Sequence, residues 1–239
     1  MASIKAVCLD AAGTLFRPRQ RVGAIYARHA VAHGLPATPD LEDALEARFR
    51  AAFAAMPAPP YRPRAPEYNA GVDRDWWRRL VAEAVTGLGP LEFDAFFDAV
   101  YQAFAEPQQW CTYPETLETL ARLRDAGLPV AIVSNFDARL LPICRGLGLA
   151  ERVDAIIYSA ALGAAKPDPA IFHEALACLG TPAAATLHVG DSFREDVAGA
   201  RAAGLYAVHL RRDHPARRET LTNDPPVITD LTGLLRHLS

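Results

Sequence analysis

The sequence predicts an α/β fold: a doubly wound, parallel-sheet, Rossmann-like core with an inserted all-helical domain. From residue 114 onward, short apolar runs alternate with helical patterns, as in the repeated β-α units of a parallel sheet. Between the first apolar run and that point, helical patterns dominate and no convincing strand is evident. We therefore expect residues 1–16 and 108–239 to form the core, and residues 17–107 to form the helical insert.

The first predicted element is a strand at residues 4–9, and it is almost entirely apolar. Such a run is typical of a strand that is covered on both faces, as the strands of a parallel sheet are. A turn of small residues, 10–14, follows it. The proline-rich stretch 57–66 predicts a loop inside the insert, because proline lacks a backbone donor and interrupts helices. Helical patterns in the insert cover residues 21–33, 39–56, 73–85 and 91–105.

After the insert, turn signals separate the predicted helices from short apolar strands. The predicted helices cover residues 114–126, 138–147, 170–179, 195–203 and 231–237. The predicted strands cover residues 130–134, 154–159, 186–189, 206–210 and 227–228.

Composition excludes several classes of protein. The 239 residues carry a net charge of −3, with 51% hydrophobic and 22% charged residues, which is ordinary for a globular protein and not for a disordered one. The basic stripe that nucleic-acid binding requires is missing, and no apolar run is long enough to span a bilayer. The four cysteines lack CxxC spacing, so we expect reduced thiols in a cytoplasmic protein.

Polar residues follow several predicted strands directly, at the carboxyl ends where doubly wound sheets bind ligands. They are Asp10 after the first strand, Ser134 and Asn135 after the second, Lys166 in the loop after the third, and Asp191 and Asp196 after the fourth. The strands therefore bring three carboxylates, a hydroxyl and an ammonium to one edge of the sheet.

This set of groups points to phosphoryl chemistry. Carboxylates at one edge repel each other unless a cation lies among them, and aspartates with a backbone carbonyl and waters suit Mg²⁺. Asp10 projects from a glycine-containing turn, where its carboxylate can attack an electrophile. Ser134 and Lys166 can then bind the oxygens of the transferring group. Only Lys5 and Lys166 are lysines among the 25 basic residues, which favours a need for a compact ammonium at position 166.

The same residues lie in four motifs that resemble, in the same order, those of the haloacid dehalogenase superfamily. The motifs are Asp10-Ala11-Ala12-Gly13-Thr14-Leu15, Ser134-Asn135, Lys166-Pro167-Asp168-Pro169, and Gly190-Asp191-Ser192 followed by Asp196-Val197-Ala198-Gly199-Ala200. Ser134-Asn135-Phe136-Asp137 together with Trp76-Trp77 resembles the haloacid dehalogenase-like hydrolase domain-containing protein 3 branch. The resemblance implies that residues 17–107 are a helical cap of the C1 type, which closes over the substrate.

The resemblance also implies a Mg²⁺-dependent hydrolase, a phosphatase that acts through an aspartyl-phosphate on a small phosphorylated metabolite. The implied catalytic residues are Asp10 as nucleophile and Lys166, which positions it. The implied metal ligands are Asp10, the Ala12 carbonyl, Asp191 and Asp196, the last directly or through water. Thr14, which would also orient the first loop, Ser134 and Asn135 are the implied phosphate-binding residues. We expect no nucleic-acid or membrane partner, and a monomer or homodimer.

One position departs from the pattern. Most phosphatases of the superfamily carry a second aspartate two residues after the nucleophile, which protonates the leaving group, and here that position is Ala12. General acid–base help of this kind is worth about 10²–10⁴ in rate, and a methyl group offers none.

Three interpretations of Ala12 stay open. The protein is a phosphatase for leaving groups that need no proton, or one whose acid comes from the cap. Alternatively, it is a relative with other chemistry, a 2-haloacid dehalogenase or a phosphonatase-like hydrolase. Dehalogenases lack the paired acidic residues seen here, and phosphonatases need a cap lysine, which residues 17–107 do not contain. In the third interpretation it is a low-turnover phosphate-binding or regulatory protein.

Overall fold

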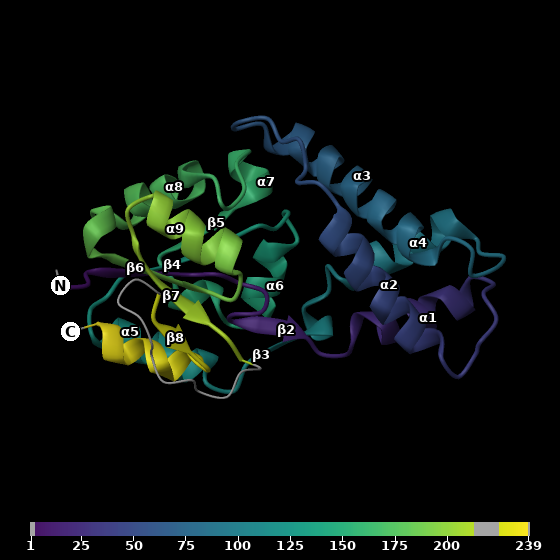
Figure 1. Ribbon diagram of the computed structural model, residues 1–239, viewed down its shortest axis with the longest axis horizontal. Coiled ribbons are helices and arrows are strands. Elements are labelled where there is room, and N and C mark those ends of the chain that lie inside the picture. Colours follow the sequence, from purple (N-terminus) through teal and green to yellow (C-terminus); the bar gives the residue numbers. More distant parts are fainter. Residues whose placement is uncertain (1–2, 213–224, 239) are drawn as a thin grey trace.

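The computed structural model of the protein describes residues 3–212 and 225–238 (Figure 1). Its central sheet has six parallel strands in the order β5-β4-β1-β6-β7-β8. The strands are β1 (Ala6–Leu9), β4 (Val130–Ser134), β5 (Ala155–Tyr158), β6 (Thr186–Gly190), β7 (Tyr206–Leu210) and β8 (Val227–Ile228). The predicted α/β class is confirmed. The strand order reverses direction at β1, which makes the carboxyl end of β1 the place where ligands are expected.

Helices cover both faces of the sheet, so the strands are buried on both sides. Helices α5 (Thr116–Asp125) and α6 (Leu140–Gly146) pack on one face, and α8 (Pro169–Leu179) and α9 (Gly199–Ala202) pack on the other. Along β1, Val7 and Leu9 contribute to the first of these cores and Cys8 to the second. The alternation explains why the first strand is apolar throughout.

The helical insert forms a separate bundle beside the sheet (Figure 1). It consists of α1 (Val22–Ala32), α2 (Leu41–Ala55), α3 (Pro66–Val85) and α4 (Phe93–Ala103). Its own core is rich in aromatic residues and includes Tyr26, Leu45, Trp76, Leu80, Phe96 and Phe97. The fold is therefore a Rossmann-like sheet with a helical insertion, while the exact limits of the two domains stay a prediction.

The prediction that residues 17–107 contain no strand is wrong at its first residues. Strand β2 (Phe16–Pro18) pairs antiparallel with β3 (Trp110–Thr112), where the chain leaves and re-enters the core. Three-residue strands are too short to show a periodic pattern, and the proline in β2 disfavours a strand. The ribbon joins the two ends of the insert, since β2 precedes its helices and β3 follows them.

Other elements differ from prediction at their boundaries or in their type. Helix α3 begins at Pro66 instead of residue 73, since proline is well accommodated at the first helical position. Residues 195–203 do not form one α-helix but a π-helical turn (Phe193–Ala198) followed by α9. Residues 231–237 are 3₁₀-helical, not α-helical. The short helix α7 (Ser159–Leu162) and three 3₁₀ segments, Pro107–Gln109, Ala150–Arg152 and Ala183–Ala185, complete the described chain.

In the ranges 3–212 and 225–238, no helix combines the length and the apolar character that crossing a bilayer requires.

The packing of α1 against α2 gives a stability prediction. A Cβ at Gly23 would lie 2.2 Å from the Glu42 carbonyl oxygen, so we expect Gly23→Ala to lower the free energy of unfolding by about 1–3 kcal/mol. Gly71 in α3 is the matched control, because a Cβ there meets nothing within 4 Å. Gly71→Ala should raise stability by about 0.5–1 kcal/mol through helix propensity. Urea denaturation measures both, and effects of the same sign would contradict the close helix approach.

Candidate active site

The loop after β1 holds Asp10 at the centre of the sheet edge. The Asp10 backbone N–H donates to the Val189 carbonyl oxygen of β6 at 2.9 Å, which fixes the end of β1 against its neighbour. Gly13 has a φ of +92°, and a Cβ there would lie 2.4 Å from Oδ2 of Asp191. Glycine is thus required where the loop approaches the second aspartate.

Arg212 also holds the loop that follows β1. Its guanidinium donates to the Thr14 carbonyl at 2.7 Å and to the Gly13 carbonyl at 3.2 Å, and it pairs with Glu115 at 2.8 Å. Its Cζ also lies 3.4 Å from the centroid of the Tyr113 ring. The loop conformation therefore depends on an arginine about two hundred residues away, which local sequence patterns cannot reveal.

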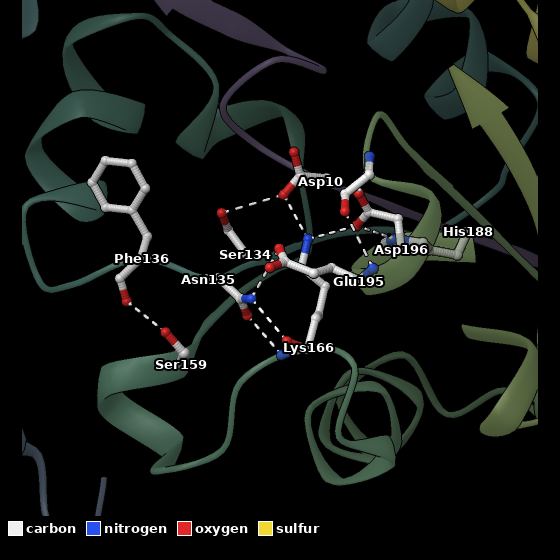
Figure 2. Close-up of polar contacts among 10 residues, drawn as sticks. Asp10, Ser134, Asn135, Phe136, Ser159, Lys166, His188, Glu195 and Asp196 are labelled. Carbon is white, nitrogen blue, oxygen red and sulfur yellow. Dashed lines mark hydrogen bonds and ion pairs between the residues drawn. The ribbon is translucent and has the colours of Figure 1, made fainter. Parts of the chain in front are cut away.

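Lys166 lies between two of the predicted aspartates (Figure 2). Its Nζ is 2.6 Å from Oδ1 of Asp10 and 2.6 Å from Oδ1 of Asp196, and the residue is only 4% exposed. Burial opposes the charge of Lys166, but the two carboxylates outweigh that effect and raise the pKa of its ammonium. Burial is also the main cause that raises the pKa of Asp10, which Lys166 opposes. The expected convergence of these side chains is confirmed.

Both carboxylate oxygens of Asp196 are engaged by the protein. Besides Lys166, Oδ1 contacts Nε2 of His188 at 3.0 Å, and Oδ2 accepts the Ser192 backbone N–H at 2.9 Å. Although burial disfavours its charge, Lys166 and His188 lower the pKa of Asp196. A Cβ at Gly190 would lie 2.1 Å from Cγ of Asp196, so the close approach leaves room only for glycine at that position.

Asp191 completes an acidic cluster. One ligand atom from each of Asp10, Asp191 and Asp196 lies within 4.8 Å of the others. Asp191 itself is exposed at the residue level. Loss of water around its carboxyl, together with the charges of Asp10 and Asp196, raises the pKa of Asp191 to about 7. Three carboxylates share one ammonium here, and this oxygen-donor set fits a divalent cation such as Mg²⁺.

Ser134 and Asn135 at the end of β4 are placed differently from each other. Ser134 Oγ lies 3.4 Å from Oδ1 of Asp10, at the cluster. The Asn135 amide accepts the Lys166 backbone N–H at 2.6 Å and donates to the Lys166 carbonyl at 2.9 Å and to Glu195 at 3.1 Å. Asn135 therefore holds the loop that carries Lys166, and its expected contact with phosphate stays a prediction.

Thr14 lies inside the loop instead of facing the site. It is fully buried, and its Oγ1 has no hydrogen-bond partner among the described residues. It does not line the cavity described next, whereas Ala12 does. The geometry supports the expected role of Thr14 in shaping the first loop more than direct phosphate binding.

A cavity of about 870 Å³ extends from the acidic cluster to the helical insert. Its core side includes Asp10, Ser134, Lys166 and Asp191, and its other walls come from the insert and its proline-rich loop. That loop and the start of α3 contact α7: the Arg64 backbone N–H donates to the Leu162 carbonyl at 2.8 Å, and the Asn69 amide donates to the Ala160 carbonyl at 2.9 Å. The insert thereby lies over the site.

Several cavity residues were not predicted from the sequence. Arg139 and Asp137 form a buried ion pair at 2.6 Å, and Trp77 Nε1 donates to Asp137 at 3.2 Å. Tyr61 and Asp73 form a second polar pair on the insert side. Helical periodicity places Asp73 one turn before the buried Trp76, but the pattern alone does not show that this face meets a cavity.

The family is shown by direct comparison. A family profile described as haloacid dehalogenase-like hydrolase matches residues 4–204. The chain therefore belongs to the haloacid dehalogenase-like hydrolases, as its four motifs implied.

Several individual proteins are similar to this chain. Haloacid dehalogenase-like hydrolase domain-containing protein 3 from Bos taurus is 36% identical over 212 residues, which cover 86% of this chain and 81% of that protein. Phosphoserine phosphatase from Thermus thermophilus is 36% identical over 111 residues, or 46% of this chain and 44% of the relative. The solved structure of the L-2-haloacid dehalogenase RSc1362 superposes with a TM-score of 0.72 at 24% identity, covering 99% of each chain. That likeness shows the fold alone.

Removing the central ammonium should destabilise the protein in a pH-dependent way. In EDTA near neutral pH, Lys166→Met leaves two buried carboxylates without their cation, and we expect a loss of about 3–5 kcal/mol in the free energy of unfolding. Unpaired buried carboxylates have raised folded-state pKa values, so the folded variant binds more protons and the loss shrinks as pH falls.

Urea denaturation between pH 5 and 8 measures this effect. The matched control is Lys5→Met, because Lys5 is the other lysine of the chain and is exposed. Equal losses in the two variants, or a loss from Lys166→Met that grows toward pH 5, would contradict the role of the ion triplet.

Proposed function

We propose that the protein is a Mg²⁺-dependent phosphatase that acts on a small phosphorylated metabolite through an aspartyl-phosphate on Asp10. The observation that carries the proposal is the placement of Lys166 between Asp10 and Asp196, with Asp191 in the same cluster. It joins a nucleophile, a fixed positive charge and a cation-binding carboxylate pair at the enclosed end of a cavity. The similarity to a phosphoserine phosphatase over 46% of the chain supports phosphate as the transferred group.

The chain's own residues provide the steps of the reaction. Lys166 and Ser134 both contact Oδ1 of Asp10, so we assign attack on phosphorus to Oδ2. A bond forms between Oδ2 and phosphorus, and the bond from phosphorus to the leaving oxygen breaks. Water then attacks phosphorus of the aspartyl-phosphate, which restores the Asp10 carboxylate and releases inorganic phosphate. Lys166 and Ser134 stabilise the charge on the equatorial oxygens during both transfers.

Three groups are proposed to hold the cation: the carboxylates of Asp10 and Asp191 and the carbonyl oxygen of Ala12. When bound there, Mg²⁺ supplies positive charge to the phosphate oxygens and to the acidic cluster. We propose that Asp196 supports the cation directly or through water, and that it also positions Lys166 through its Oδ1.

Ala12 restricts the substrates that turn over well. It lines the cavity beside Asp10 and has no proton to give to a leaving alkoxide. The proposal therefore favours acyl, enol or aryl phosphates, whose leaving groups need no proton. The same residue favours a second candidate function, a phosphate-binding or regulatory protein with little turnover.

The setting of the proposed reaction is cytoplasmic. Cys8, Cys111, Cys144 and Cys178 are all free thiols, which agrees with a reducing compartment. Burial raises the pKa of the Cys8 thiol to about 12, so this cysteine two residues before the nucleophile stays an unreactive packing residue. We propose that the protein works as a monomer or homodimer, without a nucleic-acid or membrane partner.

The proposal makes a direct prediction about activity. Release of phosphate from 4-nitrophenyl phosphate should require Mg²⁺, stop in EDTA, and fall at least about 10³-fold in Asp10→Asn, because the amide cannot act as nucleophile. Molybdate detection of phosphate measures it. Absence of Mg²⁺-dependent release from any activated ester would favour the binding protein, and metal-free chloride release from a 2-haloacid would favour a dehalogenase.

A second prediction concerns the missing acid. Ala12→Asp should raise kcat for alkyl phosphates by about 10²-fold or more and for 4-nitrophenyl phosphate much less, because only the alkoxide needs protonation. Ala12→Asn is the matched control, since it has nearly the same shape and no acid. A plot of log kcat against leaving-group pKa should become flatter in Ala12→Asp alone. Equal gains for both variants would show that shape, not proton transfer, limits turnover.

A further inference from the structure

The insert side of the cavity is apolar and aromatic. It includes Phe49, Phe53, Met56, Trp77, Phe97 and Phe104. No lysine, arginine or histidine of residues 17–107, all of which the structure describes, lines the cavity. Arg139 lines it from the core but is paired with Asp137, and the exposed Arg194 lines it from the π-helical segment that follows β6. A second phosphate or a carboxylate on the leaving group would therefore find no free cation on the insert side.

Three tyrosines, Tyr26, Tyr61 and Tyr101, and one carboxylate bring polar groups to this wall. Asp73 is 3% exposed and lines the cavity from α3. Its Oδ1 accepts the Tyr61 hydroxyl at 2.5 Å, while its Oδ2 is buried without any hydrogen-bond partner among the described residues. Burial raises the pKa of Asp73 to about 7, the charge of Asp137 adds to this, and the Tyr61 hydroxyl and Arg139 oppose it. A buried oxygen without a partner, in a residue that lines a cavity, marks a place where a ligand can supply the missing donor.

The position of this pair relative to Asp10 follows from the sheet. The Tyr61 hydroxyl lies 3.5 Å from Ser159 Oγ. Ser159 Oγ in turn donates to the Phe136 carbonyl at 3.1 Å, as Figure 2 shows. Ser159 follows β5, Phe136 lies just past β4, and Asp10 follows β1, in the strand order β5-β4-β1. Two inter-strand spacings separate the ends of β5 and β1, or about 10 Å. Tyr61 and Asp73 thus lie near the end of β5, two strands away from the strand that carries Asp10.

We propose that the substrate is the phosphate monoester of a bulky, largely apolar alcohol or phenol whose far end carries one hydroxyl or amino group, and that Asp73 selects it by accepting a hydrogen bond from that group on Oδ2. Tyr61 positions the Asp73 carboxyl. The proposal deepens the phosphatase function and rests on it for the phosphate end of the ligand. It separates this chain from enzymes that act on small polar phosphate esters, or on esters whose leaving group carries a second phosphate or a carboxylate.

The test uses phenyl phosphates that differ only in the para substituent: ethyl, 2-hydroxyethyl, 2-aminoethyl and 2-carboxyethyl. Their leaving groups have closely similar acidity, so the chemical step is matched. At pH 8 and saturating Mg²⁺, we expect kcat/KM for the hydroxyethyl and aminoethyl esters to exceed that of the ethyl ester by about tenfold, the effect of one net hydrogen bond. The carboxyethyl ester should fall below the ethyl ester, because Asp73 is mostly ionised at this pH.

Variants assign the preference to Asp73. Asp73→Ala should remove the advantage of the hydroxyethyl and aminoethyl esters through KM, and leave the kcat of the ethyl ester within about twofold. Asp73→Asn, which preserves the shape, should lower the aminoethyl ester more than the hydroxyethyl ester because it removes the charge. Asp75→Ala is the matched control, since Asp75 is an exposed acid on the same helix.

Calorimetric binding of the same esters to Asp10→Asn keeps this proposal separate from the phosphatase proposal. Preference in binding without turnover in the parent protein would overturn the phosphatase and support the selection by Asp73. Turnover without preference would support the phosphatase and overturn the selection by Asp73. An equal loss of kcat for all four esters in Asp73→Ala would place Asp73 at the bridging oxygen and overturn the proposal, as would a carboxyethyl ester that is preferred over the others.

Discussion

The site depends on one interaction, the buried ammonium of Lys166 between the carboxylates of Asp10 and Asp196. Burying a carboxylate costs several kcal/mol unless a partner and further hydrogen bonds compensate it. Around this triplet each group is held in turn: Asn135 fixes the backbone of Lys166, and His188 with the Ser192 N–H fixes Asp196. The loops after β4, β5 and β6 are thereby joined into one unit around Asp10.

The same interaction explains why lysine stands at position 166 in a chain that otherwise uses arginine almost throughout. The ammonium donates to one oxygen of each of two carboxylates at 2.6 Å, and Lys166 is only 4% exposed. A planar guanidinium presents its donors as a rigid fork and needs more room. Elsewhere the protein uses that fork where it fits, as in the pairing of Arg139 with Asp137 and the packing of Arg212 on Tyr113.

Sequence alone located the strand-end residues because parallel strands deliver their carboxyl ends to one edge of the sheet, whatever the side chains beyond them do. It did not locate Tyr61 and Asp73. Their place over the end of β5 depends on how the insert docks, through contacts such as that of Asn69 with Ala160, which are 91 residues apart in the chain. The β2–β3 ribbon was missed for a related reason, since each strand gains its partner only when the insert closes on itself.

The apolar cavity and the lack of an acidic side chain at position 12 both favour the same kind of substrate in the proposed reaction. A wall of aromatic side chains lowers the effective dielectric beside the acidic cluster, and in the proposed reaction this strengthens the attraction of Lys166 for developing negative charge. It also provides binding energy to a bulky leaving group far from the reacting bond, and such energy can be used to orient the phosphate. A site that lacks proton transfer gains most from substrates whose leaving oxygen is already stable as an anion, and aromatic alcohols meet both requirements. Under the proposed function, Ala12 and the aromatic wall of the insert therefore favour the same kind of ligand.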